Sequence, residues 1–478
     1  MATAFEATIR KVVGKGLTSI AGFNRSRMPK LEAGNPFLTG VHEPLTSEES
    51  FADLKVSGTI PPELDGKYLR NGPNPIGPDP NSYHWFTGDG MIHGMEISNG
   101  AASIYRNRWV RSTRVSQALG EAPKPGPRGI ADTANTNIIG HAGRYWAIVE
   151  AGGYPVELDG EQMTIAHNPF DGTLNAPFSA HPHCDPATGN LHAITYRGDV
   201  HDRIWHVTVD PSGRVIGEDP IRVTDGPSIH DCAITADHVL VFDMPVTFSM
   251  KAMIGGQRFP YRWNPDHAAR VGLCPLNGSA KDTVWYDVDP CYVFHTGNAF
   301  QASDGNTVVD VVTHDRVFSD SIHGPDSTDI RLERWTIDPG ARQVSRTVLD
   351  DSPQEFPRYD ERRTGQDYRY LYAVGQPRTT DLSTPTTHLV KTDLKTGTRT
   401  VRRFPHRQHP GEFVFIPRSE AGAEDDGWLM GLVIDAGAKT TDLVILNADD
   451  FRGEPQAAIT IPRQIPPGFH GNWIPAAS

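Results

Sequence analysis

Four histidines of the sequence stand in a similar setting, each beside an apolar residue and a small or turn-forming one. They are His181 in Ser-Ala-His-Pro, His230 in Ser-Ile-His-Asp, His295 in Val-Phe-His-Thr and His470 in Gly-Phe-His-Gly. Imidazole is the commonest side-chain ligand of metals. Four neutral imidazoles suit Fe2+, although zinc, nickel and copper compete for such donors. The four residues are therefore a candidate metal site, and on context alone His93 and His183 are equally admissible as ligands.

The rest of the chain must bring these distant histidines together, since they are separated by 49, 65 and 175 residues. From about residue 34 onward, short runs rich in Val, Ile, Tyr, Trp and Thr alternate with turn-forming residues, for example at 141–149, 204–210 and 331–338. This pattern predicts antiparallel strands joined by hairpins. Helical periodicity is almost absent, so the sequence indicates an all-β fold.

One short motif recurs, in which a predicted strand ends in Asp and a tight turn containing Gly follows. It occurs at 159–160, 185–189, 210–213, 338–340 and 393–397. Repeated hairpins of this kind are typical of the four-stranded blades of a β-propeller. With about 40–65 residues per blade, the four histidines fall on different blades and can meet at the central axis. The period is irregular, so a sandwich or a barrel remains an alternative.

Composition excludes several classes of function. The 478 residues carry 45 Lys and Arg against 58 Asp and Glu, a net charge of −13, with no local basic patch in the main body. This balance argues against a nucleic-acid partner. Four scattered cysteines without a CxxC pair favour neither a disulfide framework nor a zinc-thiolate site, and fit a reduced, cytoplasmic setting. No apolar run reaches the ~18 residues of a membrane span.

The first 33 residues read as a separate, basic amphipathic segment. Apolar residues recur there at helical spacing among several Arg and Lys, and Gly14 and Gly16 interrupt the continuous apolar stretch that a signal peptide needs. Two interpretations are open: a helix lying on an anionic membrane surface, or a leader that is loosely ordered or packs on the body. Residues 34–478 are expected to form a single β-propeller catalytic domain.

Ordered motifs along this second region carry a resemblance to a known family. The chain resembles the carotenoid cleavage oxygenases, which include apocarotenoid and stilbene-cleaving dioxygenases and the retinoid isomerase of the visual cycle. The motifs are Asn35-Pro-Phe-Leu-Thr-Gly40, the stretch 58–74 ending in Arg70-Asn-Gly-Pro-Asn74, Trp85-Phe-Thr-Gly-Asp-Gly-Met-Ile-His93, Ala134-Asn-Thr-Asn137, Ala180-His-Pro182, Glu355-Phe-Pro357, Gly411-Glu412, Phe415-Ile-Pro-Arg418 and Gly468-Phe-His-Gly471.

The resemblance implies a seven-bladed β-propeller with loops that form a cap over a metal site on the axis. It implies one Fe2+ held by four histidines, and it selects His181 over His183 because the family's ligand precedes a proline. It places three glutamates behind the ligands, which is sensible because a carboxylate fixes the tautomer of a ligating imidazole. The residues matched in this way are the ligands His181, His230, His295 and His470, the glutamates Glu150, Glu355 and Glu412, and Thr136, whose methyl group would block one coordination position.

The activity implied by the resemblance is oxidative cleavage of a C=C bond. Dioxygen would split a carotenoid or apocarotenoid into two aldehyde or ketone fragments, with central cleavage giving retinal. Stilbene-cleaving relatives recognise the substrate's hydroxyl with a Tyr and a Lys. Tyr105 matches the Tyr here. No lysine occurs between Lys124 and Lys251. The sequence therefore favours a carotenoid or apocarotenoid, with hydroxystilbenes or related phenylpropenoids as the alternative.

A stretch at 244–261 concentrates Met and aromatic residues beside Gly255-Gly256. Flexible apolar side chains suit a tunnel mouth that dips into lipid, and the alternative is an ordinary loop packed on the propeller. The candidate mouth residues are Phe248, Met250, Met253, Ile254 and Phe259. With the basic leader, they predict a cytoplasmic enzyme in peripheral contact with the inner face of the membrane, taking an apolar substrate from it.

Three other classes of function are weighed against this one. A propeller that only binds partners has no need of four convergent histidines. A calcium-dependent propeller hydrolase requires Asp, Asn and Glu ligands on the axis. An isomerohydrolase of the same family, which incorporates water in place of dioxygen, is a specialised relative that sequence does not formally exclude.

Overall fold

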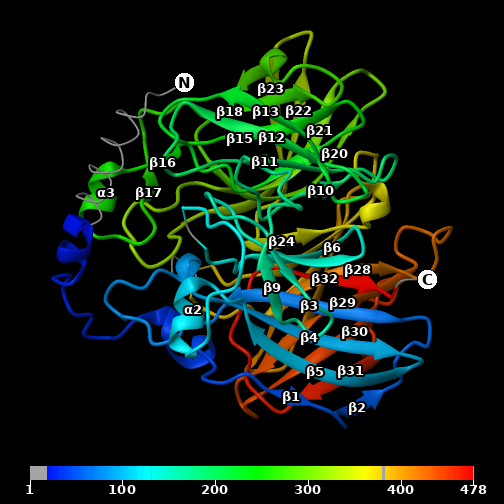
Figure 1. Ribbon diagram of the computed structural model, residues 1–478. Coiled ribbons are helices and arrows are strands. Elements are labelled where there is room, and N and C mark those ends of the chain that lie inside the picture. Colours follow the sequence, from blue (N-terminus) through cyan, green and yellow to red (C-terminus); the bar gives the residue numbers. More distant parts are fainter. Residues whose placement is uncertain (1–18, 131, 379–382, 477–478) are drawn as a thin grey trace.

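The computed structural model describes residues 19–130, 132–378 and 383–476. Within these ranges the chain forms seven antiparallel sheets of four or five strands and one two-stranded hairpin. The sheets are the blades of a propeller, and the first strands of several blades lie near the middle of the molecule (Figure 1). The prediction of an all-β, seven-bladed propeller is confirmed, and the sandwich and barrel alternatives are wrong.

Five blades are each built from four strands that follow one another along the chain. The recurring Asp and Gly motifs lie in their hairpins: Gly213, for example, turns between the third and fourth strands of one blade with a φ of 82°. The strands, blade by blade, are β6 (Asn137–His141), β7 (Arg144–Ile148), β8 (Val156–Leu158) and β9 (Thr164–His167); β10 (His183–Cys184), β11 (Leu191–Thr195), β12 (Arg203–Val209) and β13 (Val215–Arg222); β14 (Cys232–Ile234), β15 (His238–Asp243), β18 (Arg270–Pro275) and β19 (Val284–Asp287); β20 (Tyr292–Gln301), β21 (Thr307–His314), β22 (Ile330–Asp338) and β23 (Gln343–Asp350); β24 (Gln354–Arg358), β25 (Tyr370–Gly375), β26 (His388–Asp393) and β27 (Thr398–Arg403).

Two blades of five strands close the ring by combining strands from both ends of the chain. In the first, β32 pairs with β3, and Arg70 lies opposite Gly471. This pairing fixes the segment that carries His470. The strands are β32 (Gly471–Pro475), β3 (Gly66–Pro73), β4 (Gly90–Ser98), β5 (Ala101–Trp109) and β1 (Ser50–Phe51) in this blade, and β28 (Gln408–Pro417), β29 (Gly427–Asp435), β30 (Thr440–Asn447), β31 (Ala457–Ile461) and β2 (Lys55–Gly58) in the other.

Helical segments are short, as the sequence indicates. The hairpin of β16 (Val246–Phe248) and β17 (Tyr261–Trp263) is inserted into one blade and carries α3 (Met250–Ile254). Ser249 begins α3 by accepting a hydrogen bond from the Ala252 N–H, and Gly255 and Gly256 end it. Besides a helix at the start of the described chain, the other helices are α2 (Thr113–Ala118), η1 (Pro36–Leu38), η2 (Gly40–His42), η3 (Trp85–Thr87), η4 (Ala280–Asp282) and η5 (Glu361–Arg363).

The N-terminal segment is described from residue 19, and residues 19–25 are helical. Asn24 donates a hydrogen bond to the Ile254 carbonyl at 2.7 Å, and Arg25 donates to the Gly256 carbonyl at 2.8 Å. Figure 1 shows this helix beside α3. The described part of the leader therefore packs on the propeller's inserted hairpin. Most of the predicted amphipathic pattern, at residues 1–18, lies outside the described residues, and the boundary at residue 33 stays a prediction.

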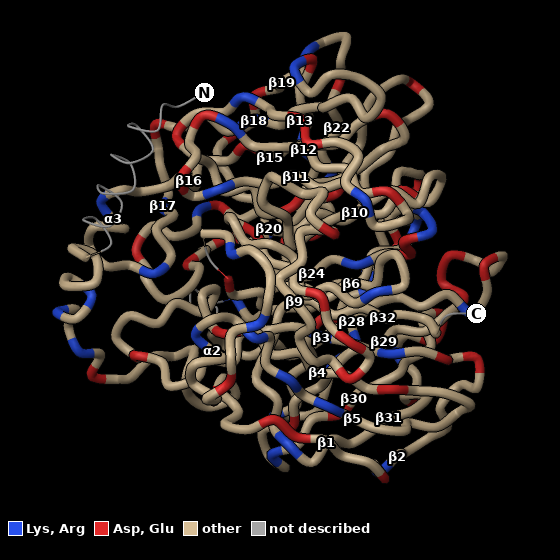
Figure 2. Tube along the Cα trace, viewed as in Figure 1, with Lys and Arg blue, Asp and Glu red and all other residues tan. Residues whose placement is uncertain are grey.

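The blades pack through buried aromatic side chains, and the charged residues are distributed as the sequence predicts. Large rings such as Trp146, Trp335 and Trp428 are fully buried, and each apolar side chain buried in this way contributes about 1.5–3 kcal/mol. Basic and acidic residues are interspersed along the described chain, without a long basic stretch (Figure 2). Among the described residues, no helix has both the length and the hydropathy needed to cross a bilayer.

Candidate metal centre

The four histidines predicted as ligands and the three glutamates predicted behind them come from seven different blades. The histidines lie just before β10, β14 and β32 or within β20, and the glutamates lie just after β7 or within β24 and β28. Each blade thus contributes one residue to the axis. In chain order these residues are Glu150, His181, His230, His295, Glu355, Glu412 and His470.

The four histidine side chains face one another through their Nε2 atoms. The Nε2–Nε2 distances are 3.2 Å from His181 to His230, 3.4 Å from His230 to His295 and 3.2 Å from His295 to His470. One ligand atom from each of the four lies within 4.8 Å of the others, and all four residues are buried. Nitrogens about 2.1 Å from one ion and at right angles are about 3.0 Å apart, so the spacing fits a shared metal ion.

Three glutamates determine which ring nitrogen carries the proton in His230, His295 and His470. His230 Nδ1 lies 2.9 Å from Glu150 Oε1, His295 Nδ1 lies 2.5 Å from Glu355 Oε2, and His470 Nδ1 lies 3.0 Å from Glu412 Oε1. A carboxylate only accepts, so each Nδ1 donates and each Nε2 keeps its lone pair. Lone pairs that converge without a donor repel one another. A bound cation would turn this repulsion into ligation.

Burial and neighbouring charges both shift the pKa values of these groups. Burial, reinforced by the other three imidazoles, holds the pKa of His181 well below its usual range. Burial also acts to lower the pKa of His295, but Glu355 outweighs it and the pKa is raised. The pKa of Glu355 is lowered despite its burial, because His295 and His314 stabilise the carboxylate. The site therefore keeps Glu355 ionised behind His295.

His181 differs from the other three, because no described carboxylate contacts its ring. His183, two residues later, is turned away from the cluster: its Nε2 lies 3.0 Å from Asp231 Oδ1. A separate group of His183, Asp231 and Cys232 has ligand atoms close enough to hold an ion. However, Asp231 is already occupied, because its oxygens also accept hydrogen bonds from the Cys232 and Thr296 N–H groups.

Replacing His183 with alanine should therefore leave metal binding close to normal. The side chain orients Asp231 and supplies no atom to the four-histidine cluster. We expect about one metal ion per chain in the purified His183→Ala protein, measured by elemental analysis, as in the wild type. Loss of the metal from this variant alone would contradict the assignment of His181 as the ligand.

Thr136 lies at the entrance to β6 and lines the same cavity as three of the histidines. Its carbonyl accepts a hydrogen bond from the His470 N–H at 3.1 Å, and its hydroxyl donates to Asn135 Oδ1 at 3.0 Å. Asn135 is held in turn by the Phe86 and Gly88 carbonyls. The hydroxyl of Thr136 is thus engaged with Asn135, and the orientation of its side chain is fixed beside His470.

A cavity of about 1360 Å³ reaches the metal-site histidines His230, His295 and His470. Small-molecule sites are commonly about 300–1,000 Å³, so this one can hold a large ligand. Aromatic rings predominate near the metal site, and the Trp85 and Phe469 rings are 4.8 Å apart. The aromatic residues that line the cavity include Trp85, Phe86, Phe259, Phe294, Phe356 and Phe469.

The cavity includes most of the predicted mouth but not the predicted substrate tyrosine. Phe248, Met250, Met253 and Phe259 line it. Ile254 does not, and its carbonyl instead receives the hydrogen bond from Asn24. Tyr105 is buried in the core of its blade, where its hydroxyl pairs with His93 Nδ1 at 2.8 Å, so it is not placed to contact a ligand in this cavity.

Comparisons with known proteins agree with this geometry. The sequence profile described as retinal pigment epithelial membrane protein matches residues 42–475. The chain is 39% identical to a carotenoid cleavage oxygenase of Mycobacterium tuberculosis over 93% of its length and 98% of the relative's. It is 30% identical to the apocarotenoid-15,15'-oxygenase of Synechocystis over 87% of its length and 92% of the relative's. The chain belongs to the carotenoid cleavage oxygenase family.

Solved structures of carotenoid cleavage oxygenases and their relatives share the architecture. A cobalt-substituted Synechocystis apocarotenoid oxygenase matches with a TM-score of 0.82 and 27% identity, over 92% of this chain and 98% of that one. The lignostilbene dioxygenase of Pseudomonas brassicacearum matches with a TM-score of 0.83 and 28% identity, over 94% and 100%. The family thus includes a structure whose metal has been exchanged.

Three polar residues at the site were not singled out from the sequence: Asn137, Arg358 and Asn472. Asn137 belongs to the Ala-Asn-Thr-Asn motif, and Asn472 follows His470 by two residues. Those positions were a usable signal, because both asparagines flank predicted site residues. Arg358, three residues after Glu355, joins them only through the fold.

Proposed function

We propose that this protein is a non-haem Fe2+ dioxygenase that cleaves one C=C bond of a carotenoid or apocarotenoid. The observation that carries the proposal is the convergence of four imidazole Nε2 atoms beside a large cavity lined with aromatic rings. The balanced reaction consumes one alkene and one dioxygen and yields two carbonyl fragments, each with one of the oxygen atoms. Membership of an oxygenase family supports the use of dioxygen.

Fe2+ is the cofactor that we assign to the four histidines. Their four neutral nitrogen donors fit Fe2+ among the divalent metals of the first transition row, and the glutamates behind them supply compensating negative charge. When bound, the ion supplies the redox chemistry that allows dioxygen to react with an alkene. His181, His230, His295 and His470 would hold it, and Thr136 beside His470 would restrict access to it.

The protein's own contribution is to position one double bond among many that are chemically similar. Phe86 and Phe469 are 5.5 Å apart with their rings nearly perpendicular, at 89°. Rings that pack this tightly form rigid walls, so a polyene has few ways to slide between them. The same apolar walls exclude water from the reacting atoms. The choice of the double bond that is cleaved would therefore depend on where the two ends of the substrate bind in the cavity.

Hydroxystilbenes are the second candidate substrates, because the lignostilbene dioxygenase has the same fold at a TM-score of 0.83. The cavity speaks against them in one respect. No lysine is among the described residues that line it, and Tyr105 lies outside the lining. A phenolate would have to be stabilised by one of the lining arginines, Arg70, Arg203 or Arg258, because burying it without a cation is costly. Carotenoids and apocarotenoids have no such requirement.

The proposal is tested by incubating the Fe2+-loaded protein with an apocarotenal and, separately, with resveratrol under 18O-labelled dioxygen. Mass spectrometry of the aldehydes identifies both the bond and the oxygen source. Labelled retinal or a related short apocarotenal supports the proposal. Labelled hydroxybenzaldehydes alone would assign the stilbene reaction, and turnover without label would indicate hydrolytic chemistry. Absence of any product would contradict the dioxygenase assignment.

We also propose that α3 and the helix at residues 19–25 rest together on the inner face of a membrane. Ile20, Phe23 and Met250 are 49%, 54% and 44% exposed, and hydrogen bonds from Asn24 and Arg25 tie the two helices together. Exposed apolar side chains beside basic ones are typical of interfacial helices. Arg27 lies over the Phe23 ring at 4.0 Å. Delivery of an apolar substrate through the adjacent mouth follows from this placement.

Charged substitutions at this surface should weaken membrane binding without affecting the metal site. We expect Phe23→Asp and Met250→Asp together to lower co-sedimentation with anionic vesicles by at least about 10-fold, because two apolar groups would have to be replaced in lipid by carboxylates. Iron content should be unchanged. Exposed Val348, on β23, offers a matched control. If Val348→Asp reduced co-sedimentation equally, the proposed surface would be wrong.

A further inference from the structure

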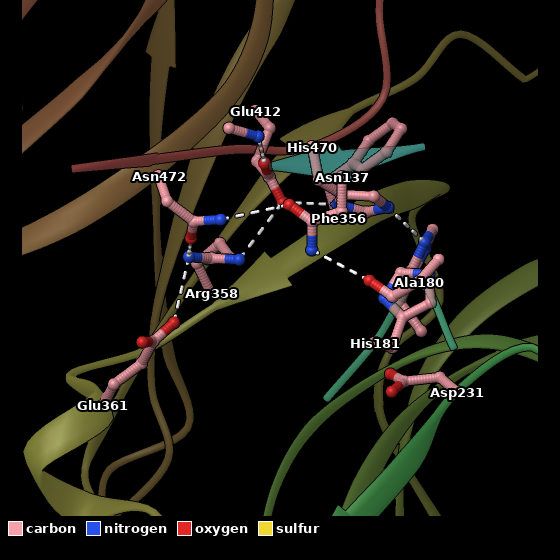
Figure 3. A network of polar contacts seen from close by, with 12 residues as sticks. Asn137, Ala180, His181, Asp231, Phe356, Arg358, Glu361, Glu412, His470 and Asn472 are labelled. Carbon is pink, nitrogen blue, oxygen red and sulfur yellow. Dashed lines mark hydrogen bonds and ion pairs between the residues drawn. The ribbon is translucent and has the colours of Figure 1, made fainter. Parts of the chain in front are cut away.

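A chain of polar side chains leads from Arg358 to the segment that carries His181 (Figure 3). It runs from Arg358, at the end of β24, to Asn472 on β32 and Asn137 on β6. All three residues lie at the inner ends of their blades. The chain ends at the carbonyl of Ala180, immediately before His181. It therefore reaches the one proposed ligand that lacks a described carboxylate on its ring.

The contacts are direct at every step. Arg358 Nη2 donates to Asn472 Oδ1 at 2.8 Å, and Asn472 Nδ2 donates to Asn137 Oδ1 at 3.0 Å. Asn137 Nδ2 then donates to the Ala180 carbonyl at 2.9 Å. Asn472 Nδ2 also donates to the Ile138 carbonyl at 2.8 Å, which ties it to the same strand.

The direction of this chain is determined by chemistry at its two ends. Arginine has donors only, so the atom of Asn472 that faces it must be the amide oxygen. The amide nitrogen of Asn472 then faces Asn137, which must present its own oxygen there. This leaves the nitrogen of Asn137 for the Ala180 carbonyl, which has acceptors only. Arginine at one end and a carbonyl at the other therefore allow a single orientation of both amides.

Two hydrogen bonds fix the backbone at His181. Its N–H donates to Ser179 Oγ at 3.0 Å, while Asn137 fixes the preceding carbonyl. Pro182 follows it, and a residue before proline is restricted to extended conformations. Ser179, Ala180 and Asn137 are buried. These constraints leave the His181 side chain little freedom except rotation about its own bonds.

We propose that Asn137 and Asn472 are positioning residues for His181, and that this backbone clamp replaces the carboxylate that orients each of the other three ligands. The inference rests on the proposed metal site and is independent of the substrate. A carboxylate acts on the ring and also raises its basicity. A clamp on the backbone positions the ring without adding charge.

Arg358 gives the clamp a link to a second ligand. Its Nη1 lies 3.7 Å from Glu412 Oε1, the oxygen that also accepts from His470 Nδ1. Its Nη2 also pairs with the more exposed Glu361 at 2.9 Å. One guanidinium thus faces the carboxylate behind His470 and the amide chain behind His181. Changes at Arg358 would disturb two ligands together, so the asparagines provide the cleaner test.

The sharpest variant is Asn137→Asp. The shape is conserved, but an acceptor replaces the amide N–H donor, so a carboxylate oxygen would face the Ala180 carbonyl. We expect affinity for Fe2+ or Co2+, measured by competition with a chelator, to fall by about 10–100-fold, as for other outer partners of metal ligands. The visible absorption bands of the Co2+-loaded protein should also change, because they report the ligand geometry directly.

Asn472→Ala provides a second variant, and Asn107→Ala provides the matched control. Asn472→Ala removes the group that orients Asn137, so we expect a smaller loss of affinity and a change in the Co2+ bands in the same direction. Asn107 is a buried asparagine on β5 that holds the loop before β1 through Ser47 and Glu49. Asn107→Ala should cost stability without changing metal affinity or the Co2+ spectrum.

The outcomes separate this inference from the function on which it rests. Lower affinity and altered Co2+ bands in both Asn137→Asp and Asn472→Ala, with Asn107→Ala unchanged, would support the clamp. Wild-type affinity and bands in Asn472→Ala and in folded Asn137→Asp would overturn it. Equal losses in all three variants would also overturn it, because they would reflect stability alone. If the wild-type protein itself bound neither metal, the metal-site proposal would fail first.

Discussion

Replacement of His470 by alanine is expected to abolish metal binding and turnover together. The variant keeps three imidazoles, and it leaves the buried carboxylate of Glu412 without the Nδ1–H that lies 3.0 Å away. Removing an outer partner alone commonly costs about 10–100-fold in metal affinity, so loss of a ligand should exceed about 100-fold. Elemental analysis and chelator competition measure the first effect, and product formation from an apocarotenal measures the second.

A buried histidine elsewhere provides the control for His470. His192, on β11, is buried and bonds to His206 at 3.1 Å, away from the four-histidine cluster. His192→Ala should lower the free energy of unfolding, yet keep its metal. A His470→Ala protein that retained a full equivalent of metal and wild-type turnover would remove His470 from the ligand set.

The structure explains why His470 can act so close to the end of the described chain. The segment at 468–471 has few local contacts of its own, but β32 pairs with β3, more than 390 positions earlier in the sequence. The His470 N–H donates to the Thr136 carbonyl, and the Gly471 N–H donates to Glu412 Oε2 at 2.8 Å. The position of His470 is therefore imposed by β3 of its own blade and by residues of two other blades.

Much of the propeller fold could be predicted from the sequence, because the Asp and Gly turn motifs and the strand patterns are local features. Motifs also identified the seven residues that the seven blades bring to the axis. Which glutamate hydrogen-bonds to which histidine could not be predicted in the same way. Glu355 and Glu412 serve histidines of adjacent blades, whereas Glu150 serves His230 across the blade of His181. A contact that passes over one blade depends on the geometry of the propeller, which local sequence patterns do not predict.

His181 and His183 show a second limit of local reasoning. Two residues apart on a strand, both side chains would point to the same face. In the structure β10 begins at His183, so His181 lies in the preceding loop and the two rings face different groups. Tyr105 shows a third limit: its place in the motif order gave no sign that its hydroxyl is committed to His93 inside the blade.

Glu355 is expected to matter more for stability than Glu150, although each supports one ligand. Glu355 accepts from two buried imidazoles, His295 at 2.5 Å and His314 at 2.7 Å, and from the Phe356 N–H at 2.8 Å. Glu150 accepts from His230 alone among the described residues, and its Oε2 atom has no described partner. Removal of Glu355 therefore leaves more buried donors unsatisfied.

We expect Glu355→Ala to lower the free energy of unfolding of the metal-free protein by roughly 3–5 kcal/mol, the cost of breaking a buried ionic network. Glu150→Ala should cost about 1–3 kcal/mol, the range for one unsatisfied buried group. Denaturant unfolding of the two metal-free variants measures the difference. Equal losses, or a larger loss in Glu150→Ala, would show that His314 does not depend on Glu355.

Glu355→Gln separates the two roles of this carboxylate. The amide oxygen can still accept from His295 Nδ1, and the amide nitrogen can donate to His314 if that ring moves its proton to Nδ1, which lies 2.6 Å from Ser327 Oγ. The variant should thus recover most of the stability lost in Glu355→Ala. It should still bind metal about 10–100-fold more weakly than the wild type, because a neutral amide raises the basicity of His295 less than a carboxylate does. Recovery of full affinity together with stability would mean that Glu355 holds His295 in place without tuning it.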